Sequence, residues 1–339
     1  MNTQYFSVAP DNPDLAVLRQ AADILRQGGL VAFPTETVYG LGANGLDAQA
    51  ATKIYQAKGR PSDNPLILHI AEITELERLS AKISPQTKKL LHQYWPGPLT
   101  VVLEKTPLVP DIVTGGLNTV AVRMPDSKTA RELIRLAGVP LAAPSANTSG
   151  RPSPTNAQAV LDDLNGKIDA IVDAGTSAIG LESTVVDLTG DIPCILRPGG
   201  ITAEMIAATL GQSQINYPGE KTAAPKSPGM KYTHYAPKYP LILAPAPILK
   251  QKITQYLTEP KKVGAIVSQE TAPTLPRAVH TITYGSHTDL PSIAASLYSA
   301  LRHFDTNPVD LIFAESVPET GIGAAIMNRL RKAACIVYE

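Results

Sequence analysis

An apolar run passes directly into a polar loop in the stretch Leu30–Gly42, LVAFPTETVYGLG. The segment Leu30–Phe33 is short, apolar and followed by a proline, which predicts a buried β-strand. Two hydroxyls and a carboxylate follow it, at Thr35, Glu36 and Thr37. In α/β folds ligands bind beyond the carboxyl ends of strands, so this loop is well placed to hold one. The same residues are also typical of a simple turn in which the threonine side chains hydrogen-bond the local backbone. Both interpretations stay open.

The composition indicates a loop-rich globular chain of 339 residues. Hydrophobic residues make up 44%, enough for a sizeable core, while 30 prolines and 24 glycines indicate many shaped loops. The net charge is zero, which argues against a protein that coats nucleic acid but allows a local basic site. The start of the chain lacks a basic region and an apolar run, and no stretch approaches roughly 18 apolar residues. Neither a signal peptide nor a membrane span is expected.

Hydrophobic periodicity and helix-capping residues predict an α/β chain. In the first part, strands are expected near 30–33, 99–103, 120–124, 141–143, 170–172 and 184–188, and helices over 14–27, 84–94, 155–164 and 202–210. Pro154-Thr155 and Thr202 are the predicted starts of the last two helices. In the tail, strands are expected near 241–244, 263–267, 279–283 and 309–314, and helices near 247–258, 290–303 and 324–334. This alternation predicts a small open α/β domain with a largely parallel sheet.

The charge is distributed unevenly along the chain. Residues 1–212 hold 17 basic and 21 acidic side chains, a net charge of −4. Residues 213–239 hold four lysines and one glutamate, a net charge of +3, among several prolines and glycines. Residues 240–339 hold nine basic and eight acidic side chains, a net charge of +1. We therefore predict a large domain over 1–212, a basic linker over 213–239 and a smaller domain over 240–339.

The usual signatures of nucleotide, zinc and serine-hydrolase sites are absent from the sequence. The segment 321–326, GIGAAI, fits part of a dinucleotide fingerprint, but its place at the last helix favours close packing. A second polar loop, residues 57–66, carries Lys58 and Arg60 and is braced by a glycine and two prolines. Such a braced loop can hold two cations still for an anion, or can expose two solvated charges.

Two further polar residues lie at the ends of predicted strands. His69 closes an apolar run, where a histidine belongs to the core more often than to a catalytic site. Arg123 closes the strand 120–124. A partly buried arginine needs an anionic partner, and both a ligand and an internal acid could supply it.

Three more polar loops follow, at 142–154, 180–184 and 196–200. The first precedes a predicted helix N-terminus, which favours anions, although an N-capping loop is the simpler interpretation. Taken together, the loops supply four cations and many hydroxyls. That set fits a nucleoside triphosphate and a small anion held without a P-loop; its cations are Lys58, Arg60, Arg123 and Arg197.

Several of these segments occur in the order found in one family. The segments 33–42 (FPTETVYGLG), 95–100 (WPGPLT), 120–125 (VAVRMP) and 143–147 (APSAN), with Lys58 and Arg60, resemble the YrdC/Sua5 family. The segments 228–237 (PGMKYTHYAP) and 321–329 (GIGAAIMNR) resemble the linker and last domain of its longer, Sua5-type branch. The resemblance implies a twisted mixed sheet with flanking helices, a linker, and a small C-terminal Rossmann-like α/β domain with an open sheet.

The resemblance implies an L-threonylcarbamoyladenylate synthase. Such an enzyme makes threonylcarbamoyl-AMP and pyrophosphate from L-threonine, bicarbonate and ATP by nucleotidyl transfer, with Mg²⁺ expected alongside ATP. Lys58 and Arg60 match catalytic positions. By the same matching, ATP would be bound by Lys58, Arg60, Asn64, Thr119, Ser145, Asn147, Ser153, Arg197 and the pair His234 and Tyr235. Threonine would be bound by Thr35, Thr37, His69, Arg123, Ala143 and Ser183. No metal ligand can be named.

The resemblance also implies a place in tRNA modification. A separate transferase would move the threonylcarbamoyl group to adenosine 37 of tRNAs that read codons starting with A. The enzyme would act in the cytoplasm without a membrane or stable nucleic-acid binding. Two alternatives stay open: an RNA-binding module without catalysis, which the scarce aromatic residues disfavour, and a domain that transfers a carbamoyl group.

Overall fold

The structure is a computed structural model that describes residues 2–212, 215–217 and 234–339. The chain divides into two compact units. The first comprises Met1–Ser149, Pro154–Ala178 and Glu182–Lys231. The second comprises Gly150–Ser153, Ile179–Leu181 and Tyr232–Glu339. Most of the predicted linker 213–239, namely 213–214 and 218–233, lies outside the described residues.

The first unit is built on a ten-stranded sheet in the order β1-β8-β2-β3-β7-β4-β6-β5-β9-β10. The sheet is mixed, as the resemblance implies: β4 and β6 are parallel, for example, whereas β5 and β6 are antiparallel. Its strands are β1 (Gln4–Ser7), β2 (Val31–Phe33), β3 (Gly40–Asn44), β4 (Ile67–His69), β5 (Leu99–Glu104), β6 (Thr119–Arg123), β7 (Leu141–Ala142), β8 (Ala170–Asp173), β9 (Thr184–Asp187) and β10 (Cys194–Arg197).

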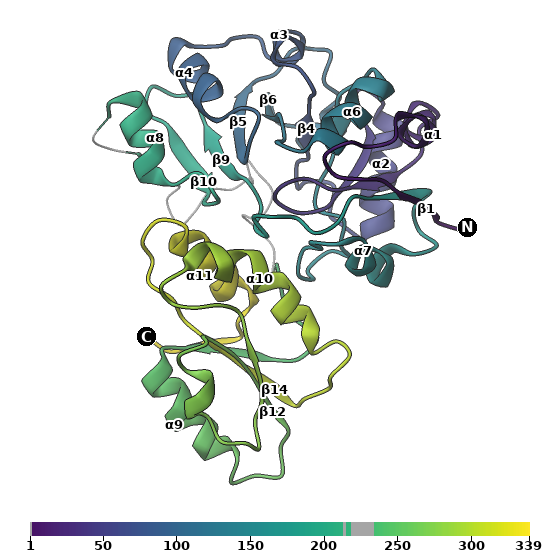
Figure 1. Cartoon of the computed structure of the whole chain (residues 1–339). Helices are drawn as coiled ribbons and strands as arrows, with labels where there is room; N and C mark the ends of the chain where they lie inside the picture. The colour runs from purple at the N-terminus through teal and green to yellow at the C-terminus, as the bar shows by residue number, and fades with distance from the viewer. Residues whose placement is uncertain (1, 213–214, 218–233) are drawn as a thin grey trace. The chain divides into compact units, whose positions relative to one another are not determined.

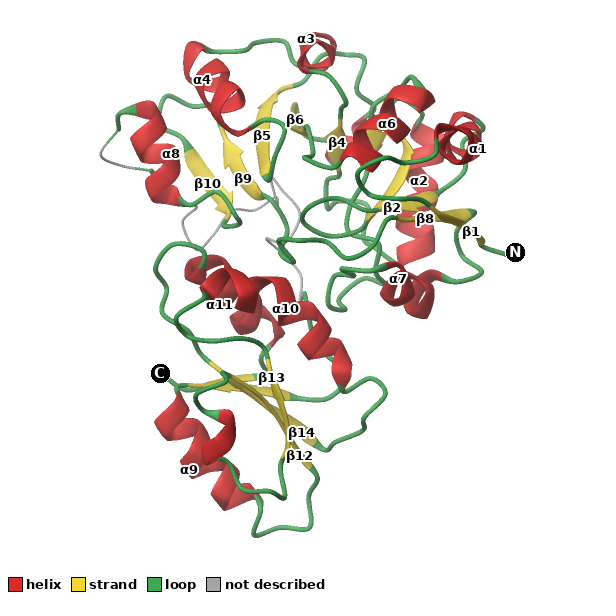
Figure 2. Ribbon diagram, in the orientation of Figure 1, coloured by secondary structure: helices red, strands yellow, loops and turns green. Residues whose placement is uncertain are grey.

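Helices cover both faces of this sheet (Figures 1 and 2). Alternation along β2 places Val31 and Phe33 in the core beneath α1 and α6, and Ala32 in the core on the other face. The second core is covered by α2, α4, α5, α7 and α8. The helices are α1 (Leu15–Arg26), α2 (Ala48–Lys58), α3 (Leu76–Leu79), α4 (Pro85–Tyr94), α5 (Asp111–Thr114), α6 (Lys128–Ala137), α7 (Ala157–Leu164) and α8 (Ala203–Leu210), with the 3₁₀ turn η1 (Ile73–Glu75).

Side-chain caps define where several helices begin. The N-cap serine before α4 accepts a hydrogen bond from the backbone of Thr87, and the N-cap threonine before α8 accepts one from Met205, as predicted. The predicted start of α7 at Pro154-Thr155 is wrong. Asn156 is the N-cap there, because its Oδ1 accepts a hydrogen bond from the backbone of Ala159 at 2.9 Å.

Two predicted loops begin or end inside regular structure. The polar loop after β2 is predicted to run to Gly42, but β3 begins at Gly40 and pairs with β2 in antiparallel register. The basic loop was expected to begin at Ala57, but Lys58 is the last residue of α2. Gly59 ends that helix with a left-handed φ of 62°. Lys58 is therefore held by a helix, while Arg60 follows in the loop.

The second unit contains a five-stranded sheet in the order β13-β12-β14-β11-β15, in which every pairing is parallel. The predicted open, largely parallel α/β architecture of the tail is confirmed. Helix α9 packs on one face, and α10 and α11 lie on the other (Figure 2). The elements are β11 (Leu241–Ala244), α9 (Ala246–Tyr256), β12 (Val263–Val267), η2 (Ala272–Thr274), β13 (His280–Thr283), α10 (Leu290–His303), β14 (Leu311–Glu315), α11 (Gly323–Ala333) and β15 (Ile336–Val337).

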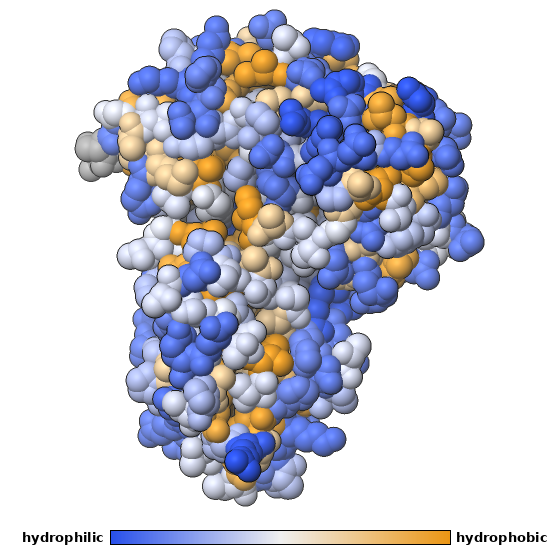
Figure 3. Space-filling model, in the orientation of Figure 1, coloured by the Kyte–Doolittle hydropathy of each residue, from blue (hydrophilic) through white to orange (hydrophobic). Residues whose placement is uncertain are grey.

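Apolar side chains on the face drawn in Figure 3 form separate patches among hydrophilic ones. The large apolar side chains that remain exposed, such as Tyr5, Ile192 and Tyr217, are scattered along the sequence. No helix in the described part of the chain is both long and apolar enough to cross a membrane.

Candidate functional site

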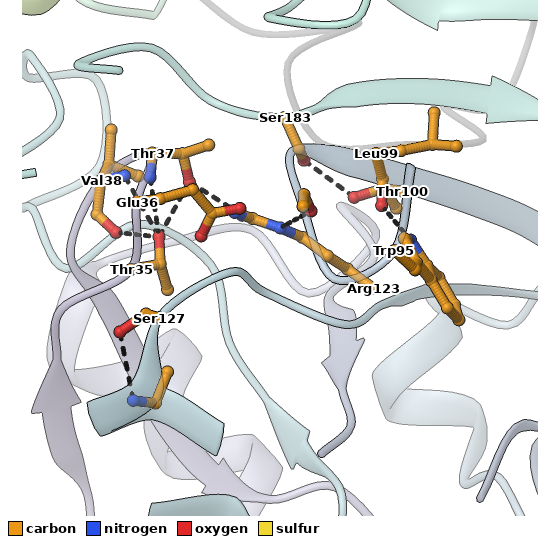
Figure 4. Close-up of polar contacts among 12 residues, drawn as sticks. Thr35, Glu36, Thr37, Val38, Trp95, Leu99, Thr100, Arg123, Ser127 and Ser183 are labelled. Carbon is orange, nitrogen blue, oxygen red and sulfur yellow. Dashed lines mark hydrogen bonds and ion pairs between the residues drawn. The ribbon is translucent and has the colours of Figure 1, made fainter. Parts of the chain in front are cut away.

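The polar loop after β2 is a compact hydroxyl turn. The Oγ1 atoms of Thr35 and Thr37 lie 2.8 Å apart, and Thr35 donates to the carbonyl oxygen of Val38 at 2.7 Å. Both threonines are buried. These local bonds are those of the simple turn considered from the sequence. They also fix the hydroxyl of Thr37 toward Arg123, whose Nη1 donates to it at 2.8 Å (Figure 4).

Arg123, the last residue of β6, has an internal acid as its partner. Its Nη2 lies 2.6 Å from Oε1 of Glu36, and the two side chains are 4% and 11% exposed. Its Nε donates to the carbonyl oxygen of Gly97 at 3.3 Å. The question left open by the sequence is thus answered for Arg123. Beyond this ion pair, neither carboxylate oxygen of Glu36 has a hydrogen-bond partner among the described residues.

His69, at the end of β4, lies in register with Arg123 on the neighbouring parallel strand. Burial, followed by the positive charge of Arg123, lowers the pKa of His69 to about 3. Its Nδ1 lies 3.1 Å from the carbonyl oxygen of Ile67, and its ring meets Phe33 edge-on. At physiological pH the His69 side chain is therefore neutral and buried. It lines the site and also packs in the core.

We predict that His69 makes the protein sensitive to acid. Its folded pKa of about 3 lies below the unfolded value, so it has no effect above roughly pH 6.5. As the pH falls below that value, only the unfolded chain takes up the proton, and stability falls by about 1.4 kcal/mol per pH unit. The free energy of unfolding is measured with urea at about pH 7 and about pH 5.5. Between these two pH values, His69→Gln should lose roughly 1.4 kcal/mol less of this free energy than the parent. The exposed His92→Gln serves as control; equal losses in all three proteins would contradict the prediction.

A second arginine is tied to Ser183, which precedes β9. Arg197, at the end of β10, donates through Nε and Nη2 to the carbonyl oxygen of Ser183 at 3.1 and 3.0 Å, and through Nη2 to its hydroxyl at 3.1 Å. The Ser183 hydroxyl in turn lies 2.8 Å from that of Thr100 (Figure 4). Thr100 faces Arg123 in the β5–β6 register. Thr100 is not among the residues predicted for the site, because the register between two strands cannot be read from the sequence of one strand.

The loop that contains Ser145 and Asn147 lies beside the hydroxyl turn. Gly40 forms an isolated antiparallel bridge with Ser145, and Tyr39 accepts a backbone hydrogen bond from Ala146 at 2.8 Å. Ala143, which follows β7, is buried, and its backbone donates to Ile67 at 2.9 Å. The predicted threonine-binding and nucleotide-binding segments are therefore adjacent in the first unit.

Lys58 reaches from the end of α2 to this loop. Its ammonium donates to the carbonyl oxygens of Ser145, at 2.5 Å, and Asn147. The side chain is 2% exposed, and the Ser145 hydroxyl donates to Oδ1 of Asn147 at 2.6 Å. Lys58 is thus not a solvated surface charge. These carbonyl groups are neutral, so the bonds fix the position of the ammonium without cancelling its charge.

Arg60, two residues after Lys58 and beyond the end of α2, also bonds to backbone carbonyl groups. Its Nε and Nη2 each lie 3.3 Å from the carbonyl oxygen of Asn64, and Nη2 lies 3.1 Å from that of Pro65. Asn64 is 1% exposed, and its Oδ1 has no hydrogen-bond partner within the described ranges. A buried, unsatisfied amide oxygen is costly in a finished core, which is consistent with a ligand donor at this point.

The remaining selected residues are Thr119, Ser153, His234 and Tyr235. Thr119 begins β6 and Arg123 ends it, about 13 Å apart at roughly 3.3 Å per residue. In the parallel β4–β6 register, Thr119 lies toward the start of β4, which follows Asn64 and Pro65. Ser153, His234 and Tyr235 belong to the second compact unit. Like Thr100, Glu36 is absent from the residues selected from the sequence, although it stands between the two selected threonines.

The candidate site has two chemically different parts. One is the buried pair Arg123 and Glu36 with adjacent hydroxyls, which presents one positive and one negative group together. The other is the pair of tethered cations Lys58 and Arg60 beside Asn64 and the loop of Ser145 and Asn147. The first suits a small zwitterion and the second suits a polyanion such as a phosphate chain.

Comparison with known proteins places the chain among relatives of one named activity. Residues 23–199 match the Sua5–YciO–YrdC family model, described as "Telomere recombination". Residues 201–335 match a model described as "Threonylcarbamoyl-AMP synthase, C-terminal domain". The threonylcarbamoyl-AMP synthase of Bacillus subtilis is 49% identical over 96% of this chain and 94% of the relative. That of Pyrococcus abyssi is 48% identical over 93% of each.

The fold agrees with a solved structure. The crystal structure of P. abyssi Sua5 complexed with L-threonine superposes with a TM-score of 0.93 at 45% sequence identity, covering 99% of this chain and all of the other. Both parts of the chain, the mixed sheet and the parallel C-terminal sheet, are included in that match. Because one family model matches residues 23–199 and the other residues 201–335, the chain belongs to the Sua5–YrdC family, in its longer Sua5 form.

Proposed function

We propose that this chain is a nucleotidyltransferase that makes threonylcarbamoyl-AMP and pyrophosphate from L-threonine, bicarbonate and ATP. The observation that carries the proposal is the buried Arg123–Glu36 pair beneath the hydroxyl turn. A free amino acid needs both a cationic and an anionic partner, and few other small substrates do. The solved P. abyssi relative in complex with L-threonine supports this assignment.

We assign the amino-acid end of the site to the charged pair. Arg123 would receive the α-carboxylate of threonine, and Glu36, whose oxygens have spare acceptor capacity, would receive its ammonium group. The hydroxyls of Thr35, Thr37 and Ser183 and the neutral ring of His69 would surround them, with Ala143 as an apolar wall. A neutral His69 adds no competing positive charge beside Arg123.

We assign the nucleotide end to the tethered cations and their neighbours. Adenylyl transfer builds negative charge on phosphoryl oxygens, and cations that are already in position stabilise it without reorganising. Lys58 and Arg60 suit that role because backbone carbonyls hold both. Asn64, Ser145, Asn147 and Arg197 would contribute polar contacts, as would Thr119 at the start of β6. Ser153, His234 and Tyr235 stay proposed ATP contacts.

Mg²⁺ is proposed only as a companion of ATP. Across the described ranges, no group of three or more histidine, cysteine, aspartate or glutamate side chains could hold a metal ion. The acidic group at the site, Glu36, is already paired with Arg123. The donor set therefore does not form a protein cage, and Mg²⁺ commonly reaches such sites bound mainly to substrate phosphates and water. None of the assignments above depends on it.

The proposed product fits a cytoplasmic role in tRNA modification. An acyl adenylate carries an activated acyl group, so a separate transferase must take it up, with adenosine 37 of tRNAs that read codons starting with A as the proposed acceptor. In this scheme the chain itself needs no stable contact with nucleic acid.

The proposal predicts pyrophosphate release that depends on three substrates. Purified protein with ATP and Mg²⁺ should release pyrophosphate only when threonine and bicarbonate are both present. Release should fall to background when either is omitted, because the acyl group cannot form. Release that persists without threonine or bicarbonate would contradict the synthase assignment. Binding of RNA without any turnover would favour the RNA-binding alternative, and turnover with carbamoyl phosphate in their place would favour carbamoyl transfer.

A further inference from the structure

The C-terminal unit includes two short segments from the first half of the chain, Gly150–Ser153 and Ile179–Leu181. Each continues without a break into a candidate site loop. The first follows Asn147 by three residues, and the second ends two residues before Ser183. A third segment, which starts at the predicted ATP contact His234, enters the same unit from the linker side. Segment 179–181 contacts helix α10, and segment 150–153 contacts the C-terminal end of that helix. The segment that starts at His234 contacts both α10 and segment 150–153.

Gly180 packs directly on the backbone of α10. Its φ is +74°, and a Cβ added there would lie 2.4 Å from Cα of Ala295 and 2.6 Å from the carbonyl oxygens of Ala294 and Ala295. These neighbours are helix backbone, which cannot turn aside as a side chain can. Only glycine therefore allows segment 179–181 to approach the helix this closely.

Segment 150–153 is tied to the end of the same helix. Arg302 of α10 donates through Nε to the carbonyl oxygen of Pro152 at 3.1 Å, and Arg151 forms an ion pair with Asp305, just beyond the helix. The carbonyl oxygen of Gly150 accepts a hydrogen bond from the backbone of Ala236 at 2.9 Å. Segments 150–153 and 234–236 are thus connected to each other as well as to the helix.

Tyr235 is held by aromatic and cationic contacts. Its φ is +65°, in the left-handed region that is unfavourable for a residue with a Cβ, so its surroundings must impose that conformation. Its ring stacks on Tyr298 of α10 at 5.5 Å between centroids and 28° between planes. The fully buried guanidinium of Arg329 lies 5.7 Å from the same ring. These ring contacts make Tyr235 an anchor, and His234 is the adjacent residue that this anchor orients.

We infer that α10 is a positioning element for the reaction: it fixes the backbone of the three segments that lead into the loops of Asn147, Ser183 and His234. This rests on the proposed function of those loops. The positioning residues are Gly180, Tyr298 and Arg302, none of which needs to touch a substrate. The C-terminal domain thereby acquires a catalytic purpose, since errors of about 1 Å in a substrate loop can lower rates by about two orders of magnitude.

Loss of each contact is expected to change a different kinetic constant. Tyr298→Leu removes the stack on Tyr235, so it should raise KM for ATP at least about tenfold while KM for threonine changes little. Gly180→Ala displaces segment 179–181 beside Ser183, so it should raise KM for threonine more than KM for ATP. Tyr298→Phe keeps the aromatic ring, so this variant should retain the KM values of the parent. The exposed neighbour Ser299→Ala is the matched control on the same helix.

The full-length variants are compared by pyrophosphate release and by thermal unfolding. The inference is overturned if Tyr298→Leu and Gly180→Ala keep both KM values within about twofold, including the case in which apparent kcat alone falls in proportion to the loss of folded protein. Should Gly180→Ala fail to fold, Arg302→Met tests the contact at Pro152 and should raise KM for ATP. If the parent shows no turnover that depends on threonine and bicarbonate, the proposed function fails instead. Calorimetric binding of threonine and of ATP to the same variants then tests the positioning separately.

Discussion

Replacement of Arg123 by methionine is expected to abolish threonine-dependent turnover and to lower the free energy of unfolding by about 3–5 kcal/mol. The substitution keeps a long side chain but leaves the Glu36 carboxylate buried without its cation, at 11% exposure. It also removes the donor to the Thr37 hydroxyl. Stability is measured by urea unfolding, and threonine affinity by calorimetry. We expect threonine affinity to fall by about 10²-fold or more, since hydrogen bonds to charged groups contribute about 1.5–3 kcal/mol each.

The double variant Arg123→Met with Glu36→Gln separates the two effects. Without the buried carboxylate, much of the stability should return, because the uncompensated charge is the main cost. Threonine binding should not return, since neither the carboxylate nor the ammonium of the substrate has a charged partner. A single variant that stays fully stable would show that the pair is effectively solvated. A double variant that still binds threonine would remove the pair from amino-acid recognition.

Local sequence signals predicted most elements whose ends are chemically marked. Helix α4 has a serine N-cap followed by proline, and α1 is ended by glycine, so both were predicted nearly to the residue. Helix α6 was missed although its N-cap Ser127 and its C-terminal Gly138 mark both ends. Strand β3 was missed because its sequence, GLGAN, is rich in glycine, which lowers strand propensity. There the hairpin pairing with β2 overrides local preference.

The candidate site was predictable as a set of loops, but its contacts were not. The sequence identified Arg123 as needing an anionic partner, yet Glu36 lies 87 positions earlier and is brought there by the sheet. Likewise, His69, Arg123 and Thr100 come together only because β4, β6 and β5 are neighbours in register. Register across separated strands depends on the whole fold, so one sequence could not reveal this row of side chains.

Replacement of Lys58 by methionine is expected to lower turnover by about 10²-fold or more, a loss typical of a removed transition-state contact. The ammonium contacts both carbonyl oxygens of the loop that carries Ser145 and Asn147. Its removal therefore takes away a cation and the tie that holds two polar groups of the nucleotide end. We expect kcat and the affinity for ATP to fall together, while calorimetric threonine binding stays near the parent value.

Lys53→Met provides the matched control on the same helix. Lys53 also donates to a backbone carbonyl, that of Gly28 at 2.7 Å, but away from the site loops. The two substitutions remove the same kind of side chain from α2 and the same kind of bond, so a loss confined to Lys58→Met must come from the site, through the missing charge or the missing tie to the loop of Ser145 and Asn147. Arg60→Ala should lower turnover to a similar degree, because Arg60 fixes the carbonyl of Asn64 in the same way. Equal activity of the Lys53 and Lys58 variants would mean that Lys58 only stabilises the helix end, and the charge at the nucleotide end would then have to come from Arg60 and Arg197.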